Sequence, residues 1–134
     1  MSTDRPTSPD RQDTLEVHVR SLGVGRSLVV ADGDVDLRTA PQLAGVLQPL
    51  LLTGGHRVLM DLSGVTFLDS TGLTCLITAY RTARRTGAHL ALIAPSERVR
   101  HMLALTGTDQ VLHSYPSLDT VPEEPELPDP GHTA

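Results

Sequence analysis

The N-terminal part of the chain alternates apolar and polar residues with the period of two that is typical of a half-buried strand. Leu15, Val17 and Val19 alternate with charged or polar neighbours, and a second apolar run covers residues 26–32. Residues 21–25 between these runs include two glycines, which favour a turn. We therefore predict that the two runs pair as a β-hairpin.

The next apolar pattern has helical spacing and predicts a first helix over about residues 41–52. Its apolar side carries Leu43, Val46, Leu47, Leu50 and Leu51. Thr39 is placed to cap this helix, and Pro41 fits an early helical position, where its missing N–H costs nothing. Pro49 removes a hydrogen bond inside the helix, so we expect a kink or a break there.

Residues 57–86 contain an abrupt change of periodicity, from an apolar run rich in strand formers at residues 57–62 to a helical pattern. The helical pattern is carried by Leu73, Leu76, Ile77, Tyr80 and Ala83. The corner Leu68-Asp69-Ser70-Thr71-Gly72 joins the two, and either Asp69 or Ser70 can accept hydrogen bonds from the first turn. Gly72 has no side chain, so another backbone segment can approach the first turn of the helix closely. This corner presents a hydroxyl group at the surface.

The remaining apolar runs predict a buried strand over residues 88–94 and a last helix that Pro95-Ser96-Glu97 opens and Thr106-Gly107 closes. The inward side chains of this helix are Val99, Met102, Leu103 and Leu105. Residues 111–113 form a possible short final strand, and we expect Asp61 to anchor a loop after the central strand.

The order of the elements favours an α/β fold, with a mixed sheet of four to five strands and helices packed against it. In such sheets, sites lie where strands end and helices begin, which points to the corner at residues 69–72.

A length of 134 residues and an apolar fraction of 39% suit one domain, which we place at residues 14–113. Residues 1–13 are polar and are expected to form a disordered segment, and the Pro-rich residues 114–134 a flexible tail. That tail holds five acidic residues and no arginine, so it accounts for the whole formal net charge of -5. Residues 1–113 are neutral, which argues against nucleic acid as a direct partner.

Composition also excludes several kinds of chemistry. All 11 basic residues are arginines, so the chain has no P-loop lysine. The six histidines are scattered without metal-ligand spacing, so we predict neither a metal nor another cofactor. The single cysteine, Cys75, forms no internal disulfide and is expected to be partly covered. We expect neither a signal peptide nor a membrane span, and hence a cytoplasmic protein.

Four stretches of the chain resemble the STAS domains, and within them the bacterial anti-sigma factor antagonists, or anti-anti-sigma factors. They are Gly33-Asp34-Val35-Asp36 with Thr39-Ala40-Pro41, residues 58–65, residues 67–73 and residues 99–112. The third stretch is the specific one, because the serine directly after its aspartate is the phosphoacceptor of kinase-regulated antagonists, and that serine is Ser70. The resemblance also implies partner contacts at Asp34, Asp36, Asp69, Ser70, Thr71 and Gly72.

The resemblance implies a partner-switching cycle. The unphosphorylated protein would bind an anti-sigma factor that is also a serine kinase, and so release the sigma factor. Phosphorylation of Ser70 would abolish binding, and a PP2C-type phosphatase would restore it. The protein would then be a monomer or weak homodimer that regulates transcription and catalyses nothing.

Other interpretations remain open from the sequence. In one alternative, the protein is an enzyme and Ser70 is its nucleophile. In the other, the chain is a structural STAS subunit of a sensory or transporter-associated complex. Asp69-Ser70 also suits a plain helix cap, Asp34 and Asp36 suit turn residues, and Thr71 suits support of the first turn.

A phosphate on Ser70 would lie beside Asp69, while the nearest following arginine, Arg81, is about three helical turns away. We therefore expect no local cation to neutralise it. Because a helix N-terminus tolerates an anion, phosphorylation is expected to weaken the partner complex and hardly change the fold.

Overall fold

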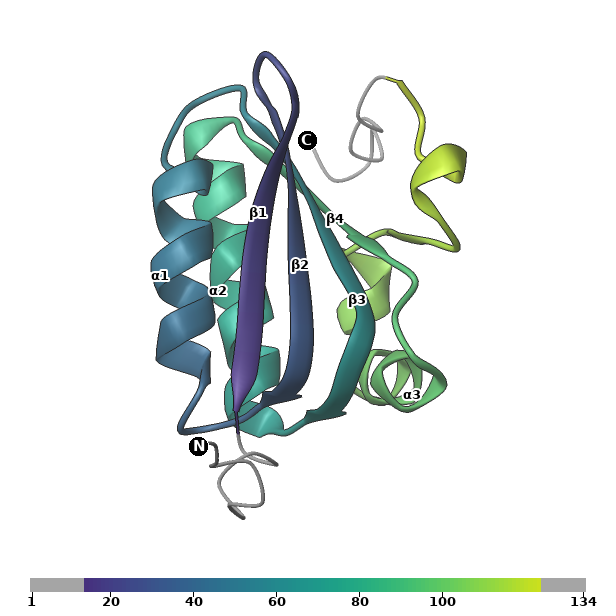
Figure 1. The fold of residues 1–134 in the computed structure, drawn as a ribbon. Coiled ribbons are helices and arrows are strands. Elements are labelled where there is room, and N and C mark those ends of the chain that lie inside the picture. Colours follow the sequence, from purple (N-terminus) through teal and green to yellow (C-terminus); the bar gives the residue numbers. More distant parts are fainter. Residues whose placement is uncertain (1–13, 124–134) are drawn as a thin grey trace, which may run out of the picture.

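The computed structural model describes residues 14–123, which build a five-stranded sheet and its covering helices (Figure 1). The strands are β1 (Leu15–Gly23), β2 (Arg26–Val35), β3 (Arg57–Leu68), β4 (His89–Ile93) and β5 (Ser114–Tyr115), and they lie side by side in this order. β1 and β2 pair antiparallel, which confirms the predicted hairpin, whereas the other three pairs are parallel. The sheet is therefore mixed, as the α/β prediction requires. Residues 1–13 and 124–134, for which disorder is predicted, lie outside the described residues.

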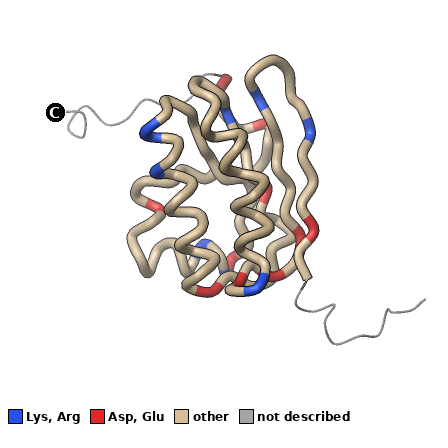
Figure 2. Tube along the Cα trace, turned by 90° about the vertical axis from the view of Figure 1, so that its left-hand side faces the viewer, with Lys and Arg blue, Asp and Glu red and all other residues tan. Residues whose placement is uncertain are grey.

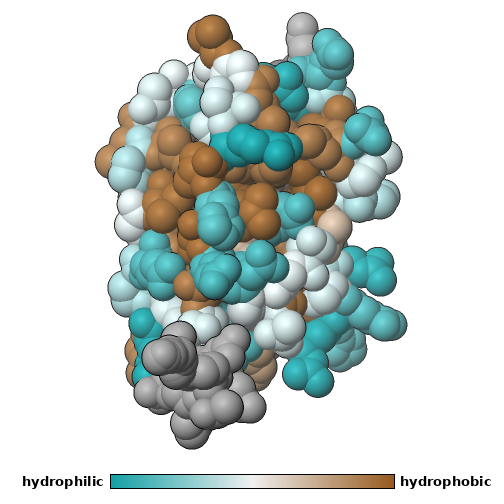
Figure 3. Space-filling view, in the orientation of Figure 1, coloured by the Kyte–Doolittle hydropathy of each residue, from teal (hydrophilic) through white to brown (hydrophobic). Residues whose placement is uncertain are grey.

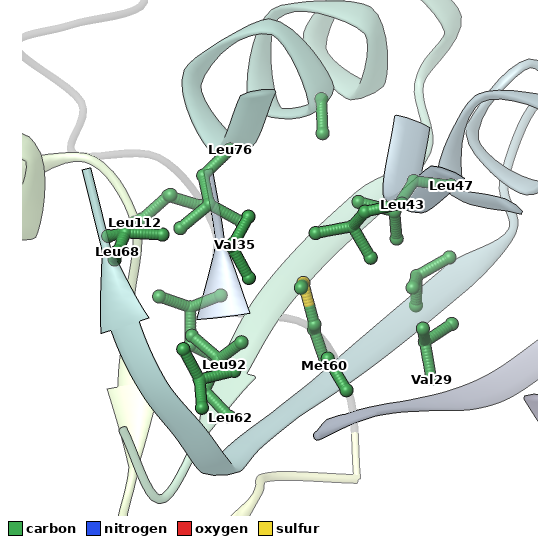
Figure 4. Close-up of a cluster of buried hydrophobic side chains, with 14 of the residues drawn as sticks. Val29, Val35, Leu43, Leu47, Met60, Leu62, Leu68, Leu76, Leu92 and Leu112 are labelled. Atoms are coloured by element: carbon green, nitrogen blue, oxygen red, sulfur yellow. The ribbon is translucent and has the colours of Figure 1, made fainter. Parts of the chain in front are cut away.

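The helices are α1 (Ala40–Leu51), α2 (Ser70–Thr86) and α3 (Glu97–Thr106), with 3-10 turns η3 (Thr108–Gln110) and η4 (Leu118–Thr120) after them. Each α-helix connects two parallel strands, and right-handed crossovers in this strand order place all three on one face of the sheet. Their buried side chains form one cluster with Val29, Val58 and Met60 of that face. Figure 4 shows Leu43 and Leu47 of α1 and Leu76 of α2 pointing into this aliphatic core, where Leu76 lies beside Val35.

The other face of the sheet holds a smaller apolar cluster of Leu28, Leu59 and Ile93. Leu118 and Val121 of the C-terminal segment pack on this cluster. In the orientation of Figure 1, apolar side chains gather over the upper part of the strands (Figure 3). The second face is thus only lightly covered.

The C-terminal segment is bound to the sheet through Arg57, which is 6% exposed at the start of β3. Its guanidinium donates to the carbonyls of Glu123 and Pro122 at 2.6 and 2.5 Å. Burial and the neighbouring Arg26 lower the pKa of Arg57. Part of the predicted tail, from Leu118 to Glu123, therefore contacts the sheet, and its remainder, residues 124–134, lies outside the described residues.

The central strand is longer than predicted, because β3 continues through Asp61 to Leu68. Asp61 does not anchor a loop as expected; its carboxylate accepts from the N–H of Ser63, at 2.8 Å, within the strand. Pairing with β2 shifts there, from Val30 opposite Asp61 to Asp32 opposite Gly64, so β3 carries an extra residue. With this bulge, one strand contains both the apolar run at residues 57–62 and the apolar residues that follow up to Leu68.

Three further predictions compare with the structure as follows. α1 continues through Pro49 without the break that was one of the two expected outcomes, because Pro49 lies in its last turn, where the loss of one hydrogen bond is tolerated. Leu105 is 72% exposed, because it lies on the outer side of α3. The last strand is Ser114–Tyr115, after residues 111–113, since pairing with β4 begins at Ser114.

Candidate functional site

Asp69 forms the junction between β3 and α2. Its backbone is extended, with φ -98° and ψ -172°, and its carboxylate accepts from the N–H of Gly72 at 2.9 Å. Asp69 is thus the N-cap that the sequence left open between Asp69 and Ser70. Ser70 begins the helix with an exposed side chain whose hydroxyl makes no hydrogen bond within residues 14–123. Because Asp69 supplies the cap, the exposed hydroxyl of Ser70 is not used for capping.

The end of β2 is pressed against this corner. The N–H of Asp69 donates to the carbonyl of Val35 at 3.2 Å, and Val35 pairs with Leu68 in the parallel ladder. A Cβ added to Gly72 would lie 2.5 Å from that carbonyl oxygen and 2.7 Å from a methyl carbon of Leu68. Only glycine permits this close approach, as the sequence predicts.

The loop between β2 and α1 brings Asp34 and Asp36 beside the same corner, because Asp36 directly follows Val35. Asp36 accepts from the N–H groups of Arg38 and Thr39 at 2.9 and 3.1 Å, which confirms its role as a turn residue. Asp34 instead accepts from the hydroxyl of Thr66 at 2.7 Å.

Thr39 occupies the N-cap position of α1, but its side chain makes no capping hydrogen bond. Its hydroxyl donates to the carbonyl of Asp34 at 2.7 Å and accepts from the N–H of Asp36 at 3.0 Å. The predicted cap is therefore wrong, and the hydroxyl holds the loop rigid.

The charge at this end of the molecule is mainly negative, and Figure 2 shows acidic residues gathered where strands turn into helices. Asp34, Asp36 and Asp69 contribute three carboxylates. Arg38 lies in the same loop, two residues after Asp36, and its backbone N–H donates to the Asp36 carboxylate. An arginine close to the corner in sequence was therefore left out of the expectation that named only the following arginine, Arg81.

Within the described residues, we also looked at metal binding, cysteine reactivity and membrane insertion. No group of three His, Cys, Asp or Glu side chains within residues 14–123 could hold a metal ion. Cys75 is half-buried on α2, and burial raises the pKa of its thiol, which keeps it protonated and unreactive. None of the helices in residues 14–123 has the length and apolar character needed to cross a membrane.

Residues 19–121 match the STAS domain family, so the chain belongs to that family. The anti-sigma-B factor antagonist of Staphylococcus epidermidis is 31% identical over 85 residues, which cover 63% of this chain and 79% of that protein. An anti-sigma factor antagonist from Mycobacterium paratuberculosis has a similar crystal structure, with a TM-score of 0.71 and 29% identity over 84% of this chain and 92% of that one. The phosphorylated Bacillus cell fate determinant SpoIIAA shares the fold, with a TM-score of 0.61 and 14% identity over 75% and 91% of the two chains.

Proposed function

We propose that this protein is an anti-sigma factor antagonist whose binding is switched off by phosphorylation of Ser70. The observation that carries the proposal is the exposed serine hydroxyl at the start of α2, released by the Asp69 cap and unbonded within residues 14–123. The relatives named above as anti-sigma factor antagonists support the assignment of an anti-sigma factor as partner.

The switch requires two enzymes that act on this chain. A kinase, which we take to be the anti-sigma factor itself, transfers the γ-phosphoryl group of ATP to the hydroxyl of Ser70. The new bond joins the serine oxygen to phosphorus, the bond from phosphorus to the ADP oxygen breaks, and the hydroxyl proton passes to a base of the kinase. A PP2C-type phosphatase then hydrolyses the phosphoserine with water and returns inorganic phosphate.

The phosphate weakens binding through its charge. Phosphoserine carries about -1.5 to -2 near neutral pH, and it joins a corner that already holds the carboxylates of Asp34, Asp36 and Asp69. Closing an interface over this site would strip water from an anion that lacks matching cations, which costs several kcal/mol. Each loss of about 1.4 kcal/mol weakens binding tenfold. The fold itself tolerates the anion, because the free N–H groups and dipole of α2 favour it.

We also propose that the chain catalyses no reaction. A nucleophilic serine needs an adjacent base, usually histidine. Within residues 14–123, no histidine lies in the loop between β2 and α1 or at the corner between β3 and α2. Leu68 stands where a nucleophile elbow has glycine.

The test is a binding titration with each purified anti-sigma factor encoded by the same genome. Wild type and Ser70→Ala should bind one of them equally, and Ser70→Asp should bind at least tenfold more weakly with an unchanged melting temperature. Gln110→Glu, which adds a charge at an exposed position of η3, is the matched control and should bind like wild type. After incubation with ATP, mass spectrometry should place the phosphate on Ser70. A phosphate elsewhere, or unchanged affinity of Ser70→Asp, contradicts the proposal.

A further inference from the structure

An open groove runs between α1 and the N-terminal half of α2, with a volume of about 280 Å³. Its surface is mainly apolar and is formed by residues such as Ala40 and Ala44 of α1 and the half-buried Cys75 of α2, together with Gln48 and three threonines of α2. This volume is at the lower limit of small-molecule sites, which typically measure about 300 to 1,000 Å³. The groove therefore suits one or two protein side chains better than a metabolite.

Leu37 forms one end of this groove and is 72% exposed. It lies in the loop between β2 and α1, which is held by the hydrogen bonds of Asp36 and Thr39. A large apolar side chain is thus presented to solvent on a rigid loop, so little conformational entropy would be lost if a partner covered it.

The groove is continuous with the proposed switch site. Thr71 lines it and directly follows Ser70, while Asp36 immediately precedes Leu37. The groove is therefore apolar inside, and the end next to the corner carries Asp36 and Asp69 together with Arg38, so its formal net charge is negative. This combination complements an apolar side chain that is flanked by arginine or lysine.

We infer that the groove between α1 and α2 receives an apolar side chain, flanked by basic residues, of the anti-sigma factor. The inference rests on the proposed function and specifies how the partner is recognised. Because Thr71 belongs to both sites, a phosphate on Ser70 lies at the rim of this contact. Docking there would bury the phosphate, so the groove explains why a surface modification controls binding.

The first test compares two leucines of equal exposure. Leu37→Ala removes a groove side chain, whereas Leu105→Ala on α3 removes one that is also 72% exposed but lies outside the groove. Since neither leucine is buried in the free protein, both variants should fold like wild type. Isothermal titration with the anti-sigma factor that binds wild type should give at least tenfold weaker binding for Leu37→Ala and an unchanged affinity for Leu105→Ala. Equal affinities for the two variants would overturn the inference.

The second test fills the groove. Ala44→Glu places a carboxylate among its apolar walls, whereas Gly45→Glu, on the next residue of α1, points into open space. Only Ala44→Glu should weaken binding, and circular dichroism should report the same helix content for both variants. If Ser70→Asp abolishes binding while Leu37→Ala and Ala44→Glu do not, the groove assignment fails and the proposed function stands. If wild type binds none of the anti-sigma factors, both fail. A wild-type dimer that Ala44→Glu dissociates would assign the groove to a second copy and overturn the inference.

Discussion

Gly72→Ala is the substitution for which the structure gives the sharpest expectation. The new methyl group would lie 2.5 Å from the carbonyl oxygen of Val35, 2.7 Å from a Leu68 methyl carbon and 2.9 Å from a methyl carbon of Val35. Real side chains essentially never approach so closely, and the carbonyl cannot swing away, because it also accepts from the N–H of Asp69. The start of α2 must therefore shift away from β2.

The magnitude follows from two opposing terms. Overpacking of this kind costs about 1 to 3 kcal/mol, and three contacts below 3.0 Å favour the upper half of that range. Alanine recovers about 0.8 to 1 kcal/mol relative to glycine in a helix. We expect Gly72→Ala to lower the free energy of unfolding by about 1 to 2 kcal/mol, which is a fall of roughly 4 to 8 °C in melting temperature for a domain of this size.

Gly45→Ala is the matched control, because a Cβ at Gly45 meets nothing within 4 Å in the middle of α1. At Gly45 there is no steric clash, and only the higher helix propensity of alanine changes the stability. The free energy of unfolding should therefore rise by about 0.5 to 1 kcal/mol. Urea unfolding of both variants measures the difference directly. If Gly72→Ala is as stable as wild type, or if both variants shift in the same direction, the close packing of α2 on β2 is refuted.

Three other predictions concern the remaining parts of the fold. Arg57→Met removes both hydrogen bonds to the C-terminal segment, so amide hydrogen exchange in η4 should accelerate at least tenfold; unchanged exchange would show that Arg57 does not hold the segment. Ala94 has a left-handed φ of 52°, so Ala94→Gly should raise stability by about 0.5 kcal/mol, whereas Ala91→Gly in β4 should lower it; urea unfolding tests both. Burial and Arg57 lower the pKa of His89 below its ordinary 6.5, so its contribution to stability is present above that pH and is lost as the pH falls. Between pH 7 and about pH 5, His89→Gln should therefore lose less stability than wild type; equal losses would argue against a shifted His89.

Local features of the fold were predictable because their signals lie within a few residues. The period-two pattern before the first turn gave the hairpin, and the helical spacing from Leu73 to Ala83 gave α2. Ser96 at the start of α3 and Gly107 at its end match their predicted positions, since caps depend on contacts three or four residues apart. The exposed position of Ser70 follows from the same logic. Its phosphorylation and the partner contacts of its neighbours stay predictions.

Other features depended on which distant segments meet. Parallel pairing of β2 with β3 carries that strand through Asp61, a residue whose local context resembles a loop. The buried guanidinium of Arg57 fixes a proline-rich segment that looks flexible by composition alone.

At the site itself, the sequence determined a helix start capped by Asp69 or Ser70, because capping involves neighbours along the chain. Tertiary structure decided that the end of β2 packs against this helix start and that Leu37 borders an apolar groove between α1 and α2. The physical reason is that three separate chain segments, the end of β2 with its loop, α1 and the start of α2, together form the charge and surface shape at this corner. Only the strand register determines which of their side chains lie side by side.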